Sequence, residues 1–246
     1  MNDTLHIHAC SKTDRGLQRP QNEDVCAADA TRHAYLVADG MGGVAGGEVA
    51  SSLFLLAVDE TFPPGETLTE STGRALVKAA FSLANEKILA HAAVTPEHKG
   101  LGCTAELLLL CRDGIILGHV GDSRTYCFHG GRLEQLTIDH SMVQEQVALG
   151  LLTRHEARHS KFRNVLTRAV GITDQLVIDI SSHKVQTGDI YLLCTDGLHG
   201  MVDDEELLSI LAFDAPLSLK AEMLINMAND AGGKDNISVT LLEILN

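Results

Sequence analysis

Three apolar runs in this chain each meet an aspartate that is followed directly by glycine or asparagine. Two runs end at such a pair and the third begins from one; the pairs are Asp39-Gly40, Asp196-Gly197 and Asp235-Asn236. The runs over 34–38, 190–195 and 237–242 have the length and composition of core strands. Because a carboxylate at a buried strand end is costly without a positive partner, three such ends are expected to converge on a hard divalent cation. The sequence therefore predicts metal-dependent chemistry.

Length and composition indicate one domain with a large core. The 246 residues are 45% hydrophobic, which is enough for a single domain over 1–246. The formal net charge of −14 argues against nucleic acid as a partner, since its phosphates would be repelled. No apolar stretch reaches the ~18 residues of a membrane span, and the polar start of the chain is unlike a signal peptide. The six cysteines form no CxxC pair, so we expect reduced thiols and a cytoplasmic protein.

The apolar periodicity predicts blocks of strands and blocks of helices rather than a regular alternation. Strands are expected over 4–10, 23–29, 34–39, 104–111, 115–120, 123–128, 132–136, 176–185, 189–195 and 236–244. Helices are expected over 47–61, 69–93, 141–149, 203–212 and 216–230, and the segment 150–175 is expected to be irregular. Short turns such as Asp113-Gly114 join consecutive strands as hairpins. This organisation predicts an α+β fold in which helices cover antiparallel sheets.

The glycine-rich segment from Asp39 to Glu48 fits the dinucleotide-binding pattern G-x-G-x-x-A, with Gly40, Gly42 and Ala45 at the fixed positions. Two features oppose nucleotide binding. Asp39 would repel the pyrophosphate, and two predicted helices intervene where the pattern needs an immediate parallel strand. We interpret Gly40 instead as a residue without a Cβ whose carbonyl can turn towards an ion held by Asp39.

Two further patterns suggest catalysis but have simpler explanations. His155-Glu156-Ala157-Arg158-His159 matches the zinc motif HExxH, yet its basic neighbours and irregular surroundings favour a chance match. Asp139-His140-Ser141 superficially resembles a nucleophilic triad, but triads assemble from distant positions. We expect this second segment to cap the helix that follows it.

Two polar clusters remain open to more than one interpretation. Arg19, Glu23 and Asp24 lie where the chain enters a predicted strand. They could be a solvated surface, or a phosphate-binding arginine beside carboxylates that are aimed at metal-bound water. Asp122 follows an apolar strand and could be a turn residue or a fourth carboxylate of the site.

Taken in order, the motifs resemble those of the metal-dependent serine/threonine protein phosphatases of the 2C type, in their compact bacterial form. The resemblance covers about residues 5–244. It rests on Arg19-x-x-Asn22-Glu23-Asp24, Asp39-Gly40-Met41-Gly42-Gly43, Gly46-Gly47-Glu48-x-Ala50-Ser51, Gly121-Asp122-Ser123-Arg124-x-Tyr126, Leu136-Thr137-x-Asp139-His140-Ser141, Asn164-Val165-Leu166-Thr167-Arg168-Ala169-Val170-Gly171, Cys194-Thr195-Asp196-Gly197-Leu198 and Gly232-Gly233-x-Asp235-Asn236-Ile237-Ser238-Val239. Each motif alone is weak, whereas the ordered set is specific.

The resemblance implies a four-layer sandwich of two central antiparallel sheets flanked by helices. Two Mn²⁺ or Mg²⁺ ions would lie in a cleft at one end. Asp39 would bridge both ions and the Gly40 carbonyl would bind one of them. Asp196 and Asp235 would hold the other, and Asn236 would support these ligands without contacting the ions.

The remaining site residues would order water, bind the substrate phosphate and bind a further ion. Glu23 and Asp24 would order bound waters, and Arg19 would hold the substrate phosphate. Bacterial relatives often carry a third ion, for which Asp122 would act together with Asp196.

The implied reaction is in-line attack of an activated water on a phosphoserine or phosphothreonine ester, without a phosphoenzyme. Phosphorylated proteins would be the substrates, a serine/threonine kinase would oppose the enzyme, and we expect a monomer. Residues 143–170 would form a flap beside the cleft.

Two residues depart from the family pattern: Cys103 replaces a small hydroxyl residue, and Met41 stands where many eukaryotic relatives have a histidine proposed as general acid. Protonation of the leaving group would then fall to water.

Two other functions fit the same motifs. A catalytically inactive module could use the fold to bind phosphoproteins, and a related hydrolase could act on small phosphate esters. The complete set of expected carboxylates favours an active enzyme over the first alternative. Comparing rates on phosphothreonine peptides and on free metabolites would decide the second.

Overall fold

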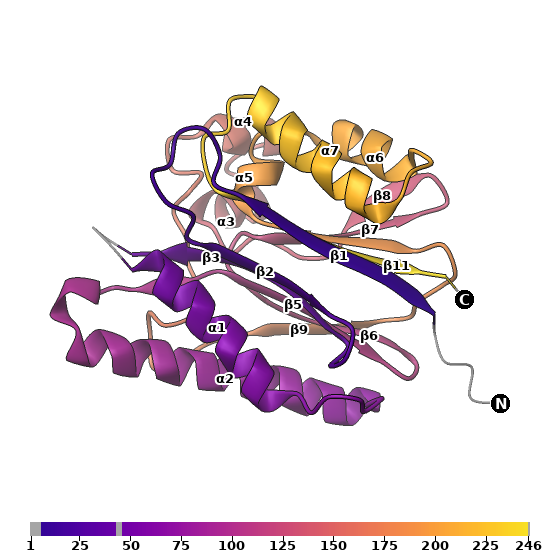
Figure 1. The fold of residues 1–246 in the computed structure, drawn as a ribbon. Coiled ribbons are helices and arrows are strands. Elements are labelled where there is room, and N and C mark those ends of the chain that lie inside the picture. The colour runs from indigo at the N-terminus through magenta and orange to yellow at the C-terminus, as the bar shows by residue number, and fades with distance from the viewer. Residues whose placement is uncertain (1–5, 43–45, 246) are drawn as a thin grey trace.

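The computed structural model describes residues 6–42 and 46–245. Two antiparallel sheets lie face to face between helices (Figure 1). The first sheet has the order β1-β11-β10-β7-β8 and the second has the order β2-β3-β5-β6-β9, with the short β4 paired to β3. The strands are β1 (Ile7–Asp14), β2 (Asp24–Asp29), β3 (Ala34–Met41), β4 (Gly102–Cys103), β5 (Ala105–Cys111), β6 (Gly114–Val120), β7 (Arg124–His129), β8 (Arg132–Gln135), β9 (Asp179–His183), β10 (Ile190–Cys194) and β11 (Ile237–Ile244).

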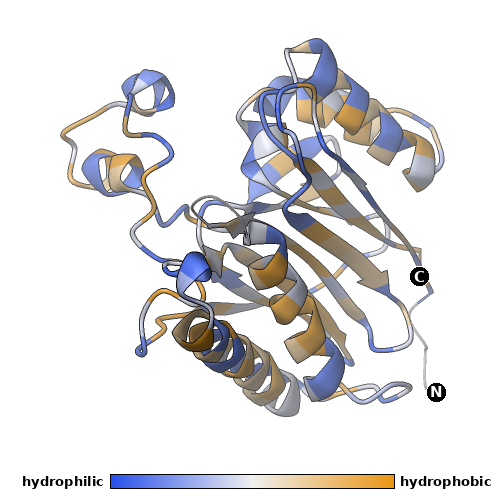
Figure 2. Cartoon of the chain, turned by 60° about the vertical axis from the view of Figure 1, so that its left-hand side comes forward, coloured by the Kyte–Doolittle hydropathy of each residue, from blue (hydrophilic) through white to orange (hydrophobic). Residues whose placement is uncertain are grey.

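Helices cover the outer faces of both sheets. The helices are α1 (Gly47–Thr61), α2 (Glu70–Val94), α3 (Met142–Ala148), α4 (Arg154–His159), α5 (Asp196–His199), α6 (Asp204–Ala212) and α7 (Leu217–Asp230), with one 3₁₀ turn at Pro96–His98. α1 and α2 lie on the second sheet, and α6 and α7 lie on the first (Figure 1). A pair of short helices stands away from the sheets in Figure 2. The predicted four-layer α+β fold is confirmed.

Most predicted elements match the observed ones closely, and the differences have local causes. The segment 150–175 is not wholly irregular, because α4 begins after a capping box in which Thr153 and Glu156 bond each other's backbone N–H groups (3.2 and 2.8 Å). The first strand continues to Asp14, since its pairing with β11 continues although its outer residues are exposed. Residues 4–5 of the predicted first strand lie outside the described residues.

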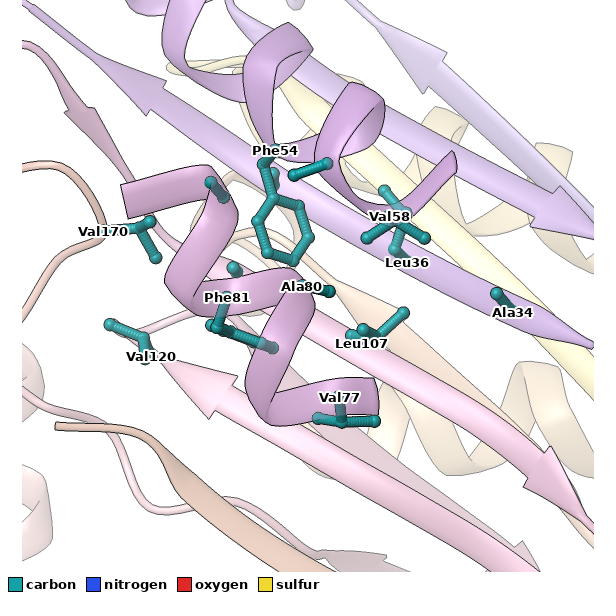
Figure 3. Packing of buried hydrophobic residues seen from close by; sticks show 14 of the residues in the cluster. Ala34, Leu36, Phe54, Val58, Val77, Ala80, Phe81, Leu107, Val120 and Val170 are labelled. Atoms are coloured by element: carbon teal, nitrogen blue, oxygen red, sulfur yellow. The ribbon is translucent and has the colours of Figure 1, made fainter. Parts of the chain in front are cut away.

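Three apolar cores hold the layers together. Between the second sheet and α1 and α2, Phe54 and Phe81 meet edge to face with ring centroids 5.1 Å apart (Figure 3). Tyr35 and Leu193 belong to a second core between the two sheets. A third core lies between the first sheet and α5, α6 and α7. No described helix combines the length and apolar character that crossing a membrane would require.

A buried polar pair also connects the two sheets. Glu106 of β5 accepts a hydrogen bond from Thr125 Oγ1 of β7 (2.6 Å) and contacts His119 Nδ1 of β6. The other ring nitrogen of His119 donates to the Ile138 carbonyl (2.9 Å). Both nitrogens face oxygen atoms, and although burial lowers the pKa of His119, Glu106 raises it to about 9, which favours the protonated ring. Asp122, one of the predicted site residues, follows His119 by three positions.

Candidate metal centre

The strand ends bring most of the predicted site residues to one cleft of about 790 Å³. Asp39 ends the apolar part of β3, Asp196 begins α5 directly after β10, and Asp235 precedes β11. The predicted residues that line the cleft are Arg19, Glu23, Asp39, Gly40, Asp122, Asp196, Asp235 and Asn236. Asp24 does not line it: this residue is buried opposite Asp39 in the pairing of β2 with β3. The roles assigned to these residues stay predictions.

Glycines after the aspartates allow backbone segments to meet closely. A Cβ on Gly40 would lie 2.5 Å from the Glu23 carbonyl oxygen, and a Cβ on Gly47 would lie 2.7 Å from Glu23 Oε1. A Cβ on Gly197 would collide with the Asn236 carbonyl oxygen. Close backbone approach is therefore a second reason for these glycines, besides the carbonyl orientation that the sequence suggests. Gly43 and Ala45 of the glycine-rich motif lie outside the described residues.

Asn236 fixes the loop that carries Arg19. Its buried side chain accepts a hydrogen bond from the Glu23 N–H (2.9 Å) and donates to the carbonyls of Arg15 (2.9 Å) and Gln21 (2.8 Å). Within this loop, the Arg19 guanidinium lies 2.6 Å from Asp235 Oδ2, while 48% of its side chain remains exposed. The arginine is therefore positioned at the opening of the cleft with its charge directed at a cleft carboxylate.

The side chains around the site do not offset the burial and mutual repulsion of its carboxylates. Burial raises the pKa of Asp24 to about 7 and of Asp196 to about 6, and neighbouring aspartates add to both shifts. Burial and the same crowding raise the pKa of Asp39 and of Asp122 well above the usual value. Among the described atoms, Oδ1 of Asp24 and Oδ1 of Asp196 are buried without a hydrogen-bond partner. Such oxygen atoms are suitable ligands for a hard cation.

The ligand geometry is not that of a closed side-chain cage. In the described ranges, no three His, Cys, Asp or Glu side chains lie close enough together to hold an ion by themselves. Hard cations in proteins also use backbone carbonyls and water, so a set that includes the Gly40 carbonyl does not need three converging side chains. In addition, the Asp235 carboxylate is paired with the Arg19 guanidinium, so one of the cleft carboxylates already has a cationic partner.

Two histidines that the sequence did not single out as site residues support the Asp122 turn. His199 Nε2 donates to the Asp122 carbonyl (2.9 Å), and the Gly121 N–H donates to His140 Nδ1 (3.1 Å). Burial lowers the pKa of His140 to about 4, so its ring is neutral and its Nε2–H can donate to Asp179 Oδ2 (3.1 Å). The only sequence signal for His199 is its place one helical turn after Asp196.

The competing sequence interpretations are tested by the same structure. His155 and His159 of the HExxH motif do lie on a helix, α4, with ring centroids 4.6 Å apart, but no third ligand joins them in the described chain. Ser141 caps α3 by accepting from the Gln144 N–H, as predicted. Asp139 binds Arg124 through two hydrogen bonds of 2.8 Å. Every strand pairing in the described residues is antiparallel, which excludes the parallel return of a dinucleotide fold there.

The fold and the cleft define a class of protein: an antiparallel sandwich with helical outer layers and a carboxylate-lined site at its strand ends. Residues 17–238 match the family described as protein phosphatase 2C. The serine/threonine phosphatase Stp of Listeria welshimeri is 34% identical over 241 residues, which is 96% of each chain. The chain belongs to the protein phosphatase 2C family.

Solved structures agree with this assignment. The crystal structure of the Mycobacterium tuberculosis serine/threonine phosphatase PstP/Ppp superposes with a TM-score of 0.91 at 33% identity, covering 98% of this chain and 99% of that one. The catalytic domain of the phosphatase PstP in complex with two manganese ions gives a TM-score of 0.88 at 34% identity, with coverages of 99% and 100%.

Proposed function

We propose that this protein is a metal-dependent protein-serine/threonine phosphatase that uses two Mn²⁺ or Mg²⁺ ions. The observation that carries the proposal is one cleft lined by Asp39, Asp122, Asp196 and Asp235, in which burial and the neighbouring aspartates raise the pKa of Asp39 and of Asp196. Among the described atoms, Oδ1 of Asp196 is buried without a hydrogen-bond partner, which fits a metal ligand. The manganese-containing PstP domain, similar over nearly the whole chain, supports the same cofactor.

The proposed ligands are oxygen atoms of strand-end residues. Asp39, the Gly40 carbonyl, Asp196 and Asp235 would hold two ions, and a third ion would use Asp122 with Asp196. Such donors suit Mn²⁺ and Mg²⁺. When bound, the ions would supply an activated water and neutralise charge on the transferring phosphoryl group.

The chain's own residues would position the substrate and the water. Arg19 would exchange Asp235 for the substrate phosphate, which its guanidinium can hold through two hydrogen bonds. Glu23 lines the cleft and would order water together with Asp24. Asp24 is already held by a hydrogen bond from Thr195 Oγ1 (2.9 Å), which supports a fixed orientation.

The cleft lining supports direct attack by water, in line and without a phosphoenzyme. Within the described residues, no cysteine, serine or histidine lines the cleft. Three threonines do line it: Thr104 Oγ1 is hydrogen-bonded to Ser123 Oγ (2.7 Å), Thr173 Oγ1 donates to the Gln175 carbonyl (3.1 Å), and Thr167 is the third. Met41 also lines the cleft and has no proton to give, so water would protonate the leaving group.

Phosphoproteins are the proposed substrates, and a serine/threonine kinase would supply them. Each relative reported above is named as a serine/threonine phosphatase, which supports this substrate class. We propose that the protein acts as a monomer in the cytoplasm. All six cysteines are free, as expected for a reducing compartment.

The test measures phosphate release from a phosphothreonine peptide with Mn²⁺, with chelator and in Asp196→Asn. We expect strong loss of activity in the last two, and weaker Mn²⁺ binding by Asp196→Asn in calorimetry. Asp230→Asn, at an exposed carboxylate ending α7, should behave as wild type. Undiminished activity of Asp196→Asn would contradict the site assignment. Peptide binding without any turnover would identify a phosphoprotein-binding module instead.

A further inference from the structure

One wall of the cleft is apolar, and the proposed metal and phosphate ligands do not account for it. This apolar wall consists of Leu166, Ile172, Leu176 and Val177. All four residues come from the segment between α4 and β9, whereas the proposed metal ligands come from strand ends. Ile172 is 46% exposed and Val177 is 58% exposed, so the wall presents an uncovered apolar surface to the cavity.

A buried asparagine holds this wall in place. Asn85 of α2 accepts a hydrogen bond from the Gly171 N–H (2.7 Å) and donates one to the Thr173 carbonyl (3.0 Å). It therefore fixes the backbone on both sides of Ile172. A Cβ on Gly102 would lie 2.8 Å from Ile172 Cδ1, so the side chain is closely seated on the backbone beneath it. An exposed apolar side chain fixed in this way is preorganised to bind a partner.

The apolar wall lies beside polar residues of the same segment that also line the cleft, namely Asn164, Thr167, Thr173 and Gln175. Leu176 and Ile178 pack partly against the core, and Val177 between them lines the cleft. Arg168 lines the same cavity, but its guanidinium donates to Asp179 Oδ1 (2.9 Å). Because this charge is already paired, the wall offers mainly apolar contact.

We propose that the apolar wall binds an apolar side chain close to the phosphorylated residue of the protein substrate; this rests on the phosphatase function proposed above. A compact cavity of about 790 Å³ would be roughly 11 Å across, the length of about three extended residues. A substrate chain whose phosphate lies at the carboxylates therefore passes along the wall within about three positions.

The test uses the full chain, Mn²⁺ and phosphothreonine peptides in a glycine-serine background. Leucine is placed singly at each of about three positions on either side of the phosphothreonine, following the length of the cleft. We expect one position at which leucine raises kcat/KM by about tenfold, as small apolar pockets do. The ratio should fall to about twofold in Ile172→Ser and in Val177→Ser. Val94→Ser, at an exposed valine ending α2 outside the cleft, should keep the tenfold ratio.

The possible results of this test distinguish the inference from the proposed phosphatase function on which it rests. Because a ratio between two peptides does not depend on the amount of folded enzyme, partial unfolding of a variant does not obscure the result. Equal kcat/KM values for all peptides in the wild-type protein would overturn the inference alone, as would a tenfold ratio that survives both substitutions. Failure to release phosphate from any peptide with Mn²⁺ would overturn the proposed function and the inference with it.

Discussion

The buried pair of His119 and Glu106 should make the stability of this protein depend on pH in a defined window. Burial lowers the pKa of His119, but Glu106 raises it more, so that it reaches about 9 against a usual 6.5. A histidine pKa raised in the folded state gives its full stabilisation below pH 6.5 and loses it as the pH passes 9. A shift of about 2.5 units corresponds to roughly 3 kcal/mol of unfolding free energy. The His119 side chain is only 3% exposed, so solvent screening removes little of this.

The perturbation is His119→Gln, which keeps a hydrogen-bonding amide and removes the charge beside Glu106. We expect the unfolding free energy to be roughly 3 kcal/mol below wild type at pH 6. The difference should shrink to a small value by about pH 10, where the wild-type ring is also neutral. Urea unfolding followed by circular dichroism, with chelator throughout, measures both proteins. Groups remote from the pair cancel in the difference. Glu106 does not, because burial raises its pKa and His119, which lowers it, is lost in the variant, so part of the loss at pH 6 comes from Glu106.

His129→Gln is the matched control for His119→Gln. His129 pairs with Asp189 Oδ1 at 2.6 Å, but 48% of its side chain is exposed. The His129 side chain is half exposed, and the buried Asp189 keeps its hydrogen bonds from the Gln186 N–H and the Tyr191 hydroxyl, so we expect His129→Gln to lose less than about 1 kcal/mol. If the loss in His119→Gln stayed constant from pH 6 to about 10, a charged pair would be refuted and packing would explain the loss.

Three further substitutions test the backbone contacts, the loop and the core. Gly197→Ala puts a Cβ into the Asn236 carbonyl, so we expect at least about 2 kcal/mol of destabilisation in urea unfolding. Asn236→Ala leaves the Glu23 N–H and two carbonyls without their partner, so KM for a phosphopeptide should rise by about tenfold as the Arg19 loop loosens, measured by steady-state kinetics. Phe54→Ala opens a cavity in the core and should cost about 3–5 kcal/mol by calorimetry, against about 0.5 or less for the exposed Leu56→Ala.

Much of the fold could be predicted because apolar periodicity reports burial. The helix predicted over 47–61 matches α1 (Gly47–Thr61), since one of its faces packs on the second sheet throughout its length. The elements that were missed or shifted depend on other forces. α4 depends on a capping box at its first turn, and the end of β1 depends on backbone pairing with β11. Neither force leaves an apolar pattern in the sequence.

The site was predictable to the extent that its residues lie at strand ends. Asp39, Asp196 and Asp235 stand next to apolar runs, so each is visible along the chain. The role of Asn85 cannot be recognised along the chain, because its partners Gly171 and Thr173 are 86 and 88 positions away. Hydrogen bonds between distant positions have no signature in a single sequence. The one readable hint of a buried network is a charge within an apolar strand, as at Glu106 in β5.

Two aspartates with opposite environments illustrate the difference between a structural carboxylate and a proposed metal ligand. Asp139 is 11% exposed and is bound by both arms of the Arg124 guanidinium. Burial raises the pKa of Asp139, but Arg124 lowers it more, so the pKa falls below its usual value. Asp196 has a buried oxygen without a partner, and its pKa rises to about 6. A structural carboxylate resembles the first case, whereas the second has the properties expected of the metal ligand proposed for Asp196.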